Sequence, residues 1–130
     1  MNNKDLVSFE LAKKLKACGF DEPCQHYYDT EDAPVGHYWR KVISISRNYN
    51  EDILKFSAPT LYAAQKWLRE KHKLHLLVDS DLYGKWCPKV VPIEECRINE
   101  GNSNYITYEQ ALSASINSAL DLLAGKEGEV

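Results

Sequence analysis

Apolar residues along this chain repeat with two different periods, and the changes between them predict the order of its elements. Leu11 and Leu15 stand at helical spacing, so a first helix is expected to begin at about residue 5 or 8 and to end at 18. The segment 21–37 that follows is acidic and contains two prolines and a glycine, which predicts a loop with a short strand at 25–28.

A strand is predicted over residues 38–47, where β-branched residues alternate with polar ones. Ile43 and Ile45 are expected to point to one face, and Ser44 and Ser46 to the opposite face. The alternation therefore indicates a strand with one buried face and one face in water.

Residues 57–78 predict a capped helix that runs directly into a strand. Ser57 or Thr60 is expected to be the N-cap, because each side chain can accept a hydrogen bond from the first turn. Trp67 is expected in the core, with its indole N–H bonded to a polar neighbour. Alternation resumes at 74–78, and because the join is only about two residues, this strand should lie against the helix. The apolar face of the helix is expected to consist of Leu61, Ala64, Trp67 and Leu68.

A further strand is predicted around residues 89–93. Pro88 and Pro92 cannot donate a backbone hydrogen bond to a neighbouring strand. We therefore expect this strand at the edge of a sheet.

The last helix is predicted over about 108–124, with Thr107 as the N-cap of a capping box. Gly125 is expected to end it, which leaves 125–130 as a loose C-terminal tail. The order is then helix, strand, helix, strand, strand, helix. It predicts one α+β domain over residues 1–130, in which about three helices pack on a small, mainly antiparallel sheet.

Composition is that of an ordinary globular protein, with 130 residues, 44% apolar and 27% charged. No stretch approaches the roughly 18 consecutive apolar residues of a membrane span. The N-terminus lacks the apolar run of a signal peptide. We therefore expect a cytoplasmic protein that does not enter a membrane.

The net charge of −3 hides a basic middle between acidic ends. Residues 36–90 hold ten Lys and Arg against five Asp and Glu, whereas residues 91–130 hold two against seven. Within the basic middle, one side of the predicted helix carries Tyr62, Lys66, Arg69 and Lys73. This basic row either binds phosphates of a nucleic acid or is simply the solvent-exposed side of an amphipathic helix.

Small residues recur at every fourth position of the last helix, at Ala111, Ser115 and Ala119. They allow another backbone to approach closely, either within the chain or across the interface of a homodimer. The aromatic cluster from His26 to Arg40 likewise either closes the core, which is the expectation, or lines a binding surface.

Four cysteines are expected to be reduced in the cytoplasm, and their spacing matches no paired zinc-ligand motif. A zinc site built from Cys24, His26, Cys87 and Cys96 is one interpretation, and buried structural thiols are the other. The chain contains no HExxH, GxGxxG or GxSxG motif and no P-loop. No catalytic residue, metal or cofactor is therefore predicted.

Three blocks of the sequence, LVSFELAKKLKACGFDEPC, SAPTLYAAQKWLREKHKLHLLV and YITYEQALSASINSALDLL, resemble small uncharacterised proteins encoded by phages, prophages and mobile elements of gut Bacteroidetes. The resemblance implies a phage or mobile-element origin and an intracellular life. It transfers no catalytic or binding residue, because that group has no assigned activity.

These observations lead to three hypotheses. The first is a non-enzymatic protein-interaction or regulatory module of phage type, whose partner is an unknown protein or a second copy of itself. The second is nucleic-acid binding through the basic face of the helix at 60–73. The third is a small metal-dependent enzyme that uses the cysteines and histidines.

Overall fold

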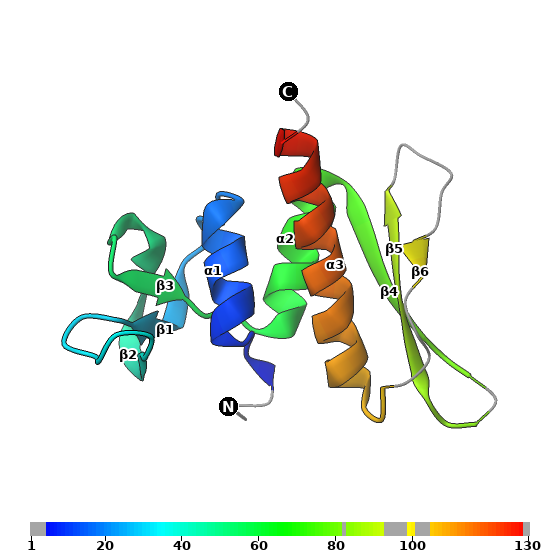
Figure 1. Cartoon of the computed structure of the whole chain (residues 1–130), viewed down its shortest axis with the longest axis horizontal. Coiled ribbons are helices and arrows are strands. Elements are labelled where there is room, and N and C mark those ends of the chain that lie inside the picture. Colours follow the sequence, from blue (N-terminus) through cyan, green and yellow to red (C-terminus); the bar gives the residue numbers. More distant parts are fainter. Residues whose placement is uncertain (1–4, 82, 93–98, 101–104, 129–130) are drawn as a thin grey trace.

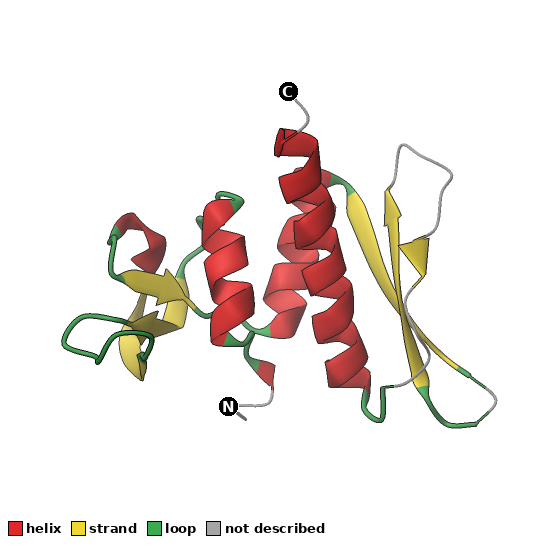
Figure 2. Cartoon of the chain, in the orientation of Figure 1, coloured by secondary structure: helices red, strands yellow, loops and turns green. Residues whose placement is uncertain are grey.

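The computed structural model describes residues 5–81, 83–92, 99–100 and 105–128. Within this part, the helices lie between two small sheets (Figures 1 and 2). The helices are α1 (Phe9–Ala17), α2 (Leu61–His72) and α3 (Tyr108–Gly128). The first sheet contains β1 (Cys24–Asp29), β2 (Trp39–Arg47) and β3 (Lys55–Ser57), and the second contains β4 (Leu74–Ser80), β5 (Trp86–Pro92) and β6 (Asn99–Glu100).

The predicted α+β class is confirmed, and the strands form two antiparallel sheets rather than one. The strands β1 to β3 precede α2 in the chain, and β4 to β6 follow it. Figure 1 shows α1 beside the first sheet, and α2 and α3 between α1 and the second sheet. The helical layer therefore separates the strands of the N-terminal half from those of the C-terminal half.

The described helices run in the same direction, so their N-termini lie at one end of the molecule (Figure 1). Each begins at a hydroxyl group that accepts a hydrogen bond from a backbone N–H three residues later. The N-caps are Ser8, Thr60 and Thr107, at 3.2, 3.1 and 3.1 Å from the nitrogens of Leu11, Ala63 and Gln110. The predicted helix starts are confirmed, and Thr60 rather than Ser57 caps α2.

The end of α3 differs from the prediction. The sequence pattern placed it at about Ala124, with Gly125 as the stop, but the helix continues to Gly128. A glycine ends a helix by adopting a positive φ angle. The described glycines that do so are Gly19, Gly36 and Gly84. Gly125 therefore does not act as a helix stop.

The core forms around α3, which packs against α1, α2, β4 and β5. Leu112, Ile116 and Leu120 of α3 are almost completely buried. Burial of each such side chain contributes about 1.5–3 kcal/mol. None of the helices that the structure describes combines the length and hydrophobicity needed to cross a bilayer. The predicted apolar faces of α1 and α2 are also buried, with Leu11, Ala12, Leu15, Leu61, Ala64, Trp67 and Leu68.

Trp67 lies in the core as predicted, but its indole N–H does not find the expected polar neighbour. Among the described residues, no acceptor meets its buried Nε1 atom. The ring instead packs edge-to-face on Phe20 and His72, with centroid distances of 5.2 and 4.7 Å. Aromatic packing thus positions Trp67 without a hydrogen bond in this part of the chain.

The strand β5 is central in the described second sheet, so the edge position that its prolines predicted is wrong. The short strand β6 pairs with β5 at Lys89 and Val90, between Pro88 and Pro92. Because the prolines lie outside this pairing, their missing N–H groups cost the β5–β6 ladder nothing. The strand β4 pairs with β5 along its length and packs against α2, as the short join required.

In the first sheet, β1 lies between β2 and β3. Its neighbouring residues Tyr27 and Tyr28 point to opposite faces. Tyr28 packs against Phe9 of α1, with ring centroids 5.6 Å apart. Tyr27 stacks at 4.1 Å on Tyr49, which belongs to the short 3-10 helix η2 (Tyr49–Glu51). The central strand is therefore covered on both faces, by α1 and by η2.

Asn50 fixes η2 to the rest of the fold. Its side-chain oxygen accepts a hydrogen bond from the N–H of Ser57 at 2.8 Å, and its amide donates to the carbonyl of Phe20 at 2.9 Å. The hydroxyl of Ser57, which is fully buried, accepts a hydrogen bond from the N–H of Tyr49 at 3.0 Å. These bonds tie η2 to β3 and to the segment that follows α1.

Replacing Asn50 with alanine is expected to lower the free energy of unfolding by about 1–3 kcal/mol, because the buried N–H of Ser57 would lose its acceptor. Urea unfolding followed by circular dichroism measures the change. The control is Ser118→Ala on the exposed side of α3, which should stay within about 0.5 kcal/mol of the wild type. Equal stability of the two variants would contradict the assigned role of Asn50.

Candidate functional site

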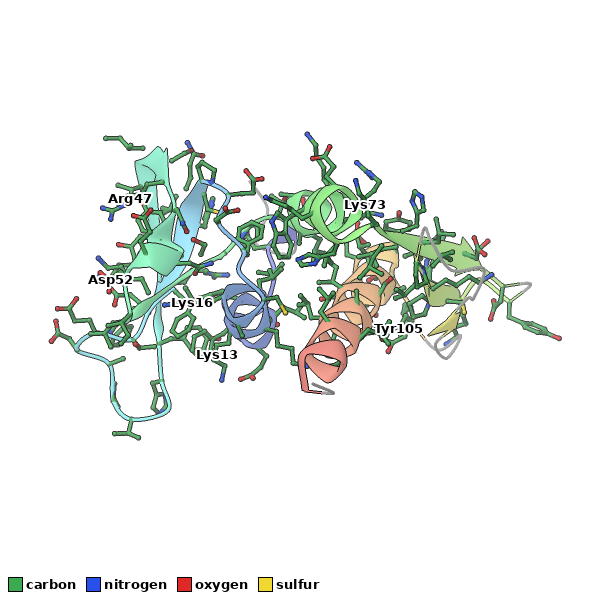
Figure 3. The ribbon with its side chains drawn as sticks, turned by 90° about the horizontal axis from the view of Figure 1, so that it is seen from above. Lys13, Lys16, Arg47, Asp52, Lys73 and Tyr105 are labelled. Carbon is green, nitrogen blue, oxygen red and sulfur yellow. The ribbon has the colours of Figure 1, made fainter. Side chains whose placement is uncertain are left out.

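The basic row lies on the exposed side of α2 and consists of Tyr62, Lys66, Arg69 and Lys73. Cations of the first sheet do not extend it. Figure 3 shows Lys73 beside α2 and Arg47 on the first sheet, on the other side of α1. Lys41 and Lys55 of that sheet form ion pairs with aspartates, each at 3.4 Å. The row is therefore a short basic face and not part of a continuous basic patch.

Tyr62, the aromatic member of the row, lies near carboxylates. Partial desolvation, followed by the charges of Glu109 and Asp5, raises the pKa of Tyr62 above its ordinary value. A phosphate placed on this ring would meet the same two negative charges. Tyr62 is therefore poorly placed to contact a nucleic acid, although Lys66 and Arg69 stay exposed.

The small residues of α3 face the inside of the chain. Ala111, Ser115 and Ala119 are each 0% exposed. The hydroxyl of Ser115 donates a hydrogen bond to the carbonyl of Lys89 in β5 at 2.9 Å. The three small side chains are thus packed within the chain, with Ser115 against β5, which is the intramolecular alternative. A second subunit cannot reach these residues in this fold, so the homodimer contact suggested at this row is not supported.

The cysteines considered as zinc ligands lie far apart in the fold. Cys24 belongs to the first sheet and Cys87 to the second, with the helices between them (Figure 1). A zinc ion needs its ligands within about 2.0–2.3 Å of one point. In the part of the chain that the structure describes, no group of three His, Cys, Asp or Glu side chains could hold a metal ion. Cys96 lies outside the described residues.

Cys24 is a buried thiol, 7% exposed, at the start of β1. Burial raises the pKa of its thiol from 9.0 to about 11. At neutral pH the group is therefore protonated, and a protonated thiol is neither a good nucleophile nor a metal ligand. The interpretation of this residue as a structural thiol fits its surroundings.

A cleft of about 640 Å³ opens at the end of the molecule where the helices begin. Its walls include the caps Ser8 and Thr107, the carboxylates Asp5 and Glu109, and Arg40. Helix N-termini favour anions, but both caps already satisfy their own helices, and the two carboxylates repel a negative charge. The cleft therefore does not select a class of ligand.

The most unusual feature of the surface is a group of exposed apolar side chains on and next to β2. We call Tyr38, Trp39, Val42, Ile43 and Ile45 the β2 surface, and their exposed fractions are 43%, 51%, 65%, 40% and 71%. The strand itself is confirmed, but the prediction that it buries one face is wrong. Arg40 and Val42 are exposed, and so are the alternate residues Lys41 and Ile43, so neither face of the strand is buried.

The pairing of β2 with β1 explains part of this exposure. The register changes between the pair His26–Val42 and the pair Cys24–Arg47. Four residues of β2, 43–46, therefore stand against the single residue Gln25 of β1. A bulge of this kind turns side chains away from the regular pleat. Ile43 and Ile45 lie within it.

The position of α1 explains why the remainder of the β2 surface is exposed. This helix packs against β3, and its Phe9 contacts the rings of Tyr28, Phe56 and Tyr38. The strand β2 lies at the edge of the sheet, with β1 on one side and no strand on the other among the described residues. The β2 surface beyond Tyr38 is thus not covered by α1.

Part of the aromatic cluster closes the core as expected, and part of it lies on the surface. Tyr27 and Tyr28 are buried, whereas Tyr38 and Trp39 are exposed. A signal for the exposed part was present in the sequence WRKVISISR. Cations occur at both odd and even positions of this strand, so neither face is purely apolar.

The stability that Cys24 contributes is expected to depend on pH. Its pKa is raised in the folded chain, so the contribution is complete below pH 9 and is lost as the pH rises to about 11. The difference in free energy of unfolding between the wild type and Cys24→Ala should therefore shrink over this range. Urea unfolding at a series of pH values measures it, and the two proteins share every other titrating group. A difference that does not change with pH would contradict the burial of the thiol.

Comparisons with protein-family models, with curated proteins and with solved structures each gave no match to this chain. The resemblance of three sequence blocks to phage-encoded proteins therefore stays a prediction. No function can be transferred from a relative.

Proposed function

We propose that this chain is a non-enzymatic protein-interaction module that binds its partner through the β2 surface. One observation carries the proposal: Val42, Ile43 and Ile45 face water on a strand whose outer edge has no neighbour in the described part of the chain. Grouped apolar side chains at a protein surface mark sites of interaction. An open strand edge also offers backbone N–H and C=O groups to a partner.

The distribution of exposed apolar residues supports this location. Outside the first sheet and its loops, the exposed large apolar residues of the described chain are scattered: Tyr62, Leu77, Tyr83 and Ile106. Single residues of this kind are normal on a protein surface. In the first sheet and its loops they include the whole β2 surface together with Val35, Ile53 and Leu54. The first sheet and its loops therefore carry most of the exposed apolar surface that a partner could bury.

Covering the β2 surface would release substantial free energy. Full burial of one Val or Ile side chain is worth about 1.5–3 kcal/mol. Trp39 adds a large aromatic group, which is the residue type most often found to dominate binding at interfaces. If the resemblance to phage-encoded proteins holds, the partner is a host or phage protein.

The proposal predicts that the immobilised chain captures a partner protein from a lysate, and that this capture is lost when the β2 surface is made polar. The double variant Val42→Ser/Ile45→Ser removes two apolar contacts at exposed positions, and such changes usually alter stability by less than about 0.5 kcal/mol. Binding should weaken by at least about tenfold, because tenfold corresponds to about 1.4 kcal/mol. Lysates of infected and uninfected bacteria supply the partners, and quantitative mass spectrometry measures their enrichment.

The matched control is Leu77→Ser, which removes an exposed apolar residue from β4 in the other sheet. This variant should capture the same protein as the wild type. The proposal fails if no protein is enriched reproducibly, or if the Val42→Ser/Ile45→Ser variant captures the partner as well as Leu77→Ser does.

The second candidate function is nucleic-acid binding, because Lys66 and Arg69 project from α2 into solvent. On this hypothesis, Lys66→Glu combined with Arg69→Glu abolishes the binding of DNA or RNA, and salt weakens binding steeply in the wild type. Gel-shift assays at low salt measure both effects. No shift of single- or double-stranded DNA or RNA by the wild type would eliminate this candidate.

A further inference from the structure

We propose that the partner segment bound by the β2 surface is an acidic one: an extended stretch of protein in which apolar side chains are flanked by carboxylates. This inference rests on the proposed function and adds the chemistry of the partner. It follows from the charges at the two ends of β2, from the apolar residues between them and from the shape of the strand edge.

The strand β2 itself carries three positive charges, one of which is paired with a carboxylate. The strand WRKVISISR contains Arg40, Lys41 and Arg47 and no Asp or Glu. Lys41 pairs with the buried carboxylate of Asp29 at 3.4 Å. In the described part of the chain, neither arginine takes part in an ion pair. The guanidinium of Arg47 is thus available to a carboxylate of a partner, and that of Arg40 shares the wall of the cleft with Asp5 and Glu109 without an ion pair to either.

Along the strand, the two arginines stand before and after the aliphatic residues Val42, Ile43 and Ile45. Arg40 comes two residues before Val42 and lies on the wall of the cleft, and Arg47 comes two residues after Ile45, at the other end of the strand. The guanidinium of Arg47 is placed 5.2 Å from the ring centre of Tyr49, which holds it on the surface of the first sheet (Figure 3). A matching segment therefore has an apolar middle and a carboxylate near each end.

A second copy of this chain does not fit the same surface. Two antiparallel β2 strands would bring together two sets of Arg40, Lys41 and Arg47, and like charges on neighbouring strands repel. The bulge at 43–46 also bends the strand edge, a device that proteins use against edge-to-edge pairing with themselves. An acidic segment relieves the first obstacle, and it can pair with the regular part of the edge at 39–42.

A nucleic acid fits less well, although the strand is basic and aromatic. Bases stack on free aromatic faces. Tyr38 is already stacked on Phe9, with centroids 4.3 Å apart and an interplanar angle of 28°. The exposed area of β2 itself is largely aliphatic, at Val42, Ile43 and Ile45, and aliphatic groups neither stack on bases nor pair with phosphates.

Three labelled peptides test the inference directly. Each has valine and isoleucine at alternate positions, and the remaining positions are all glutamate, all lysine or all serine. Fluorescence anisotropy with the full chain should show at least about tenfold tighter binding of the glutamate peptide than of the other two. This preference should decrease as salt is added.

Two variants of the chain separate charge from apolar contact. The charge-reversed Arg40→Glu/Arg47→Glu chain should prefer the lysine peptide over the glutamate peptide, an outcome that misfolding cannot imitate. Val42→Ser/Ile45→Ser should lose affinity for the glutamate peptide by at least about tenfold. Leu77→Ser should bind it as the wild type does, and thermal unfolding confirms that each variant is folded.

Several results would overturn the inference. Equal binding of the glutamate and serine peptides would show that charge does not select the partner. If none of the three peptides bound, the acidic segment would be rejected as the partner. If a protein were nevertheless captured through the β2 surface, the proposed function would still hold. Tighter binding of oligothymidylate than of the glutamate peptide, or a dimer at low salt that Val42→Ser/Ile45→Ser abolishes, would replace the acidic segment with another occupant.

Discussion

The exposure of β2 follows from the small size of α1. A helix of nine residues is about 13 Å long, whereas a strand of nine residues spans about 30 Å when fully extended. One short helix cannot cover the described sheet of three strands, and α1 lies over β1 and β3. The other face of β1 is occupied by η2. The edge strand is consequently left with apolar residues that the described part of its own chain does not bury, and the proposed binding surface depends on this shortage of cover.

Periodicity predicted the helices well because each helix contains the signals of its own formation. The caps Ser8, Thr60 and Thr107 act within three residues, and the apolar stripes need only a neighbouring layer of any kind. Predictions that depended on distant partners were less successful. The prolines of β5 suggested an edge strand, but the short pairing with β6 falls between them. A single sheet was expected, but the helices separate the strands into two sheets.

The candidate site was harder to predict than the fold for the same reason. Alternation in 38–47 shows that β-branched and polar side chains point in different directions, but burial depends on whether another element covers either face. Ala111, Ser115 and Ala119 illustrate the reverse case, since their small size was compatible with a partner, but all three are buried within the chain and Ser115 bonds to β5. The basic row was placed correctly on the surface, and its position beside Glu109 and Asp5 depends on contacts between elements.

Hydrogen exchange on the complex tests the central claim most directly. The backbone amides of β2 (Trp39–Arg47) at its open edge should exchange more slowly once a captured partner is bound, because a partner strand or surface would shield them. Amides of α2 (Leu61–His72) should be unchanged. Protection confined to α2 or to the residues of the cleft, with no change in β2, would contradict the account.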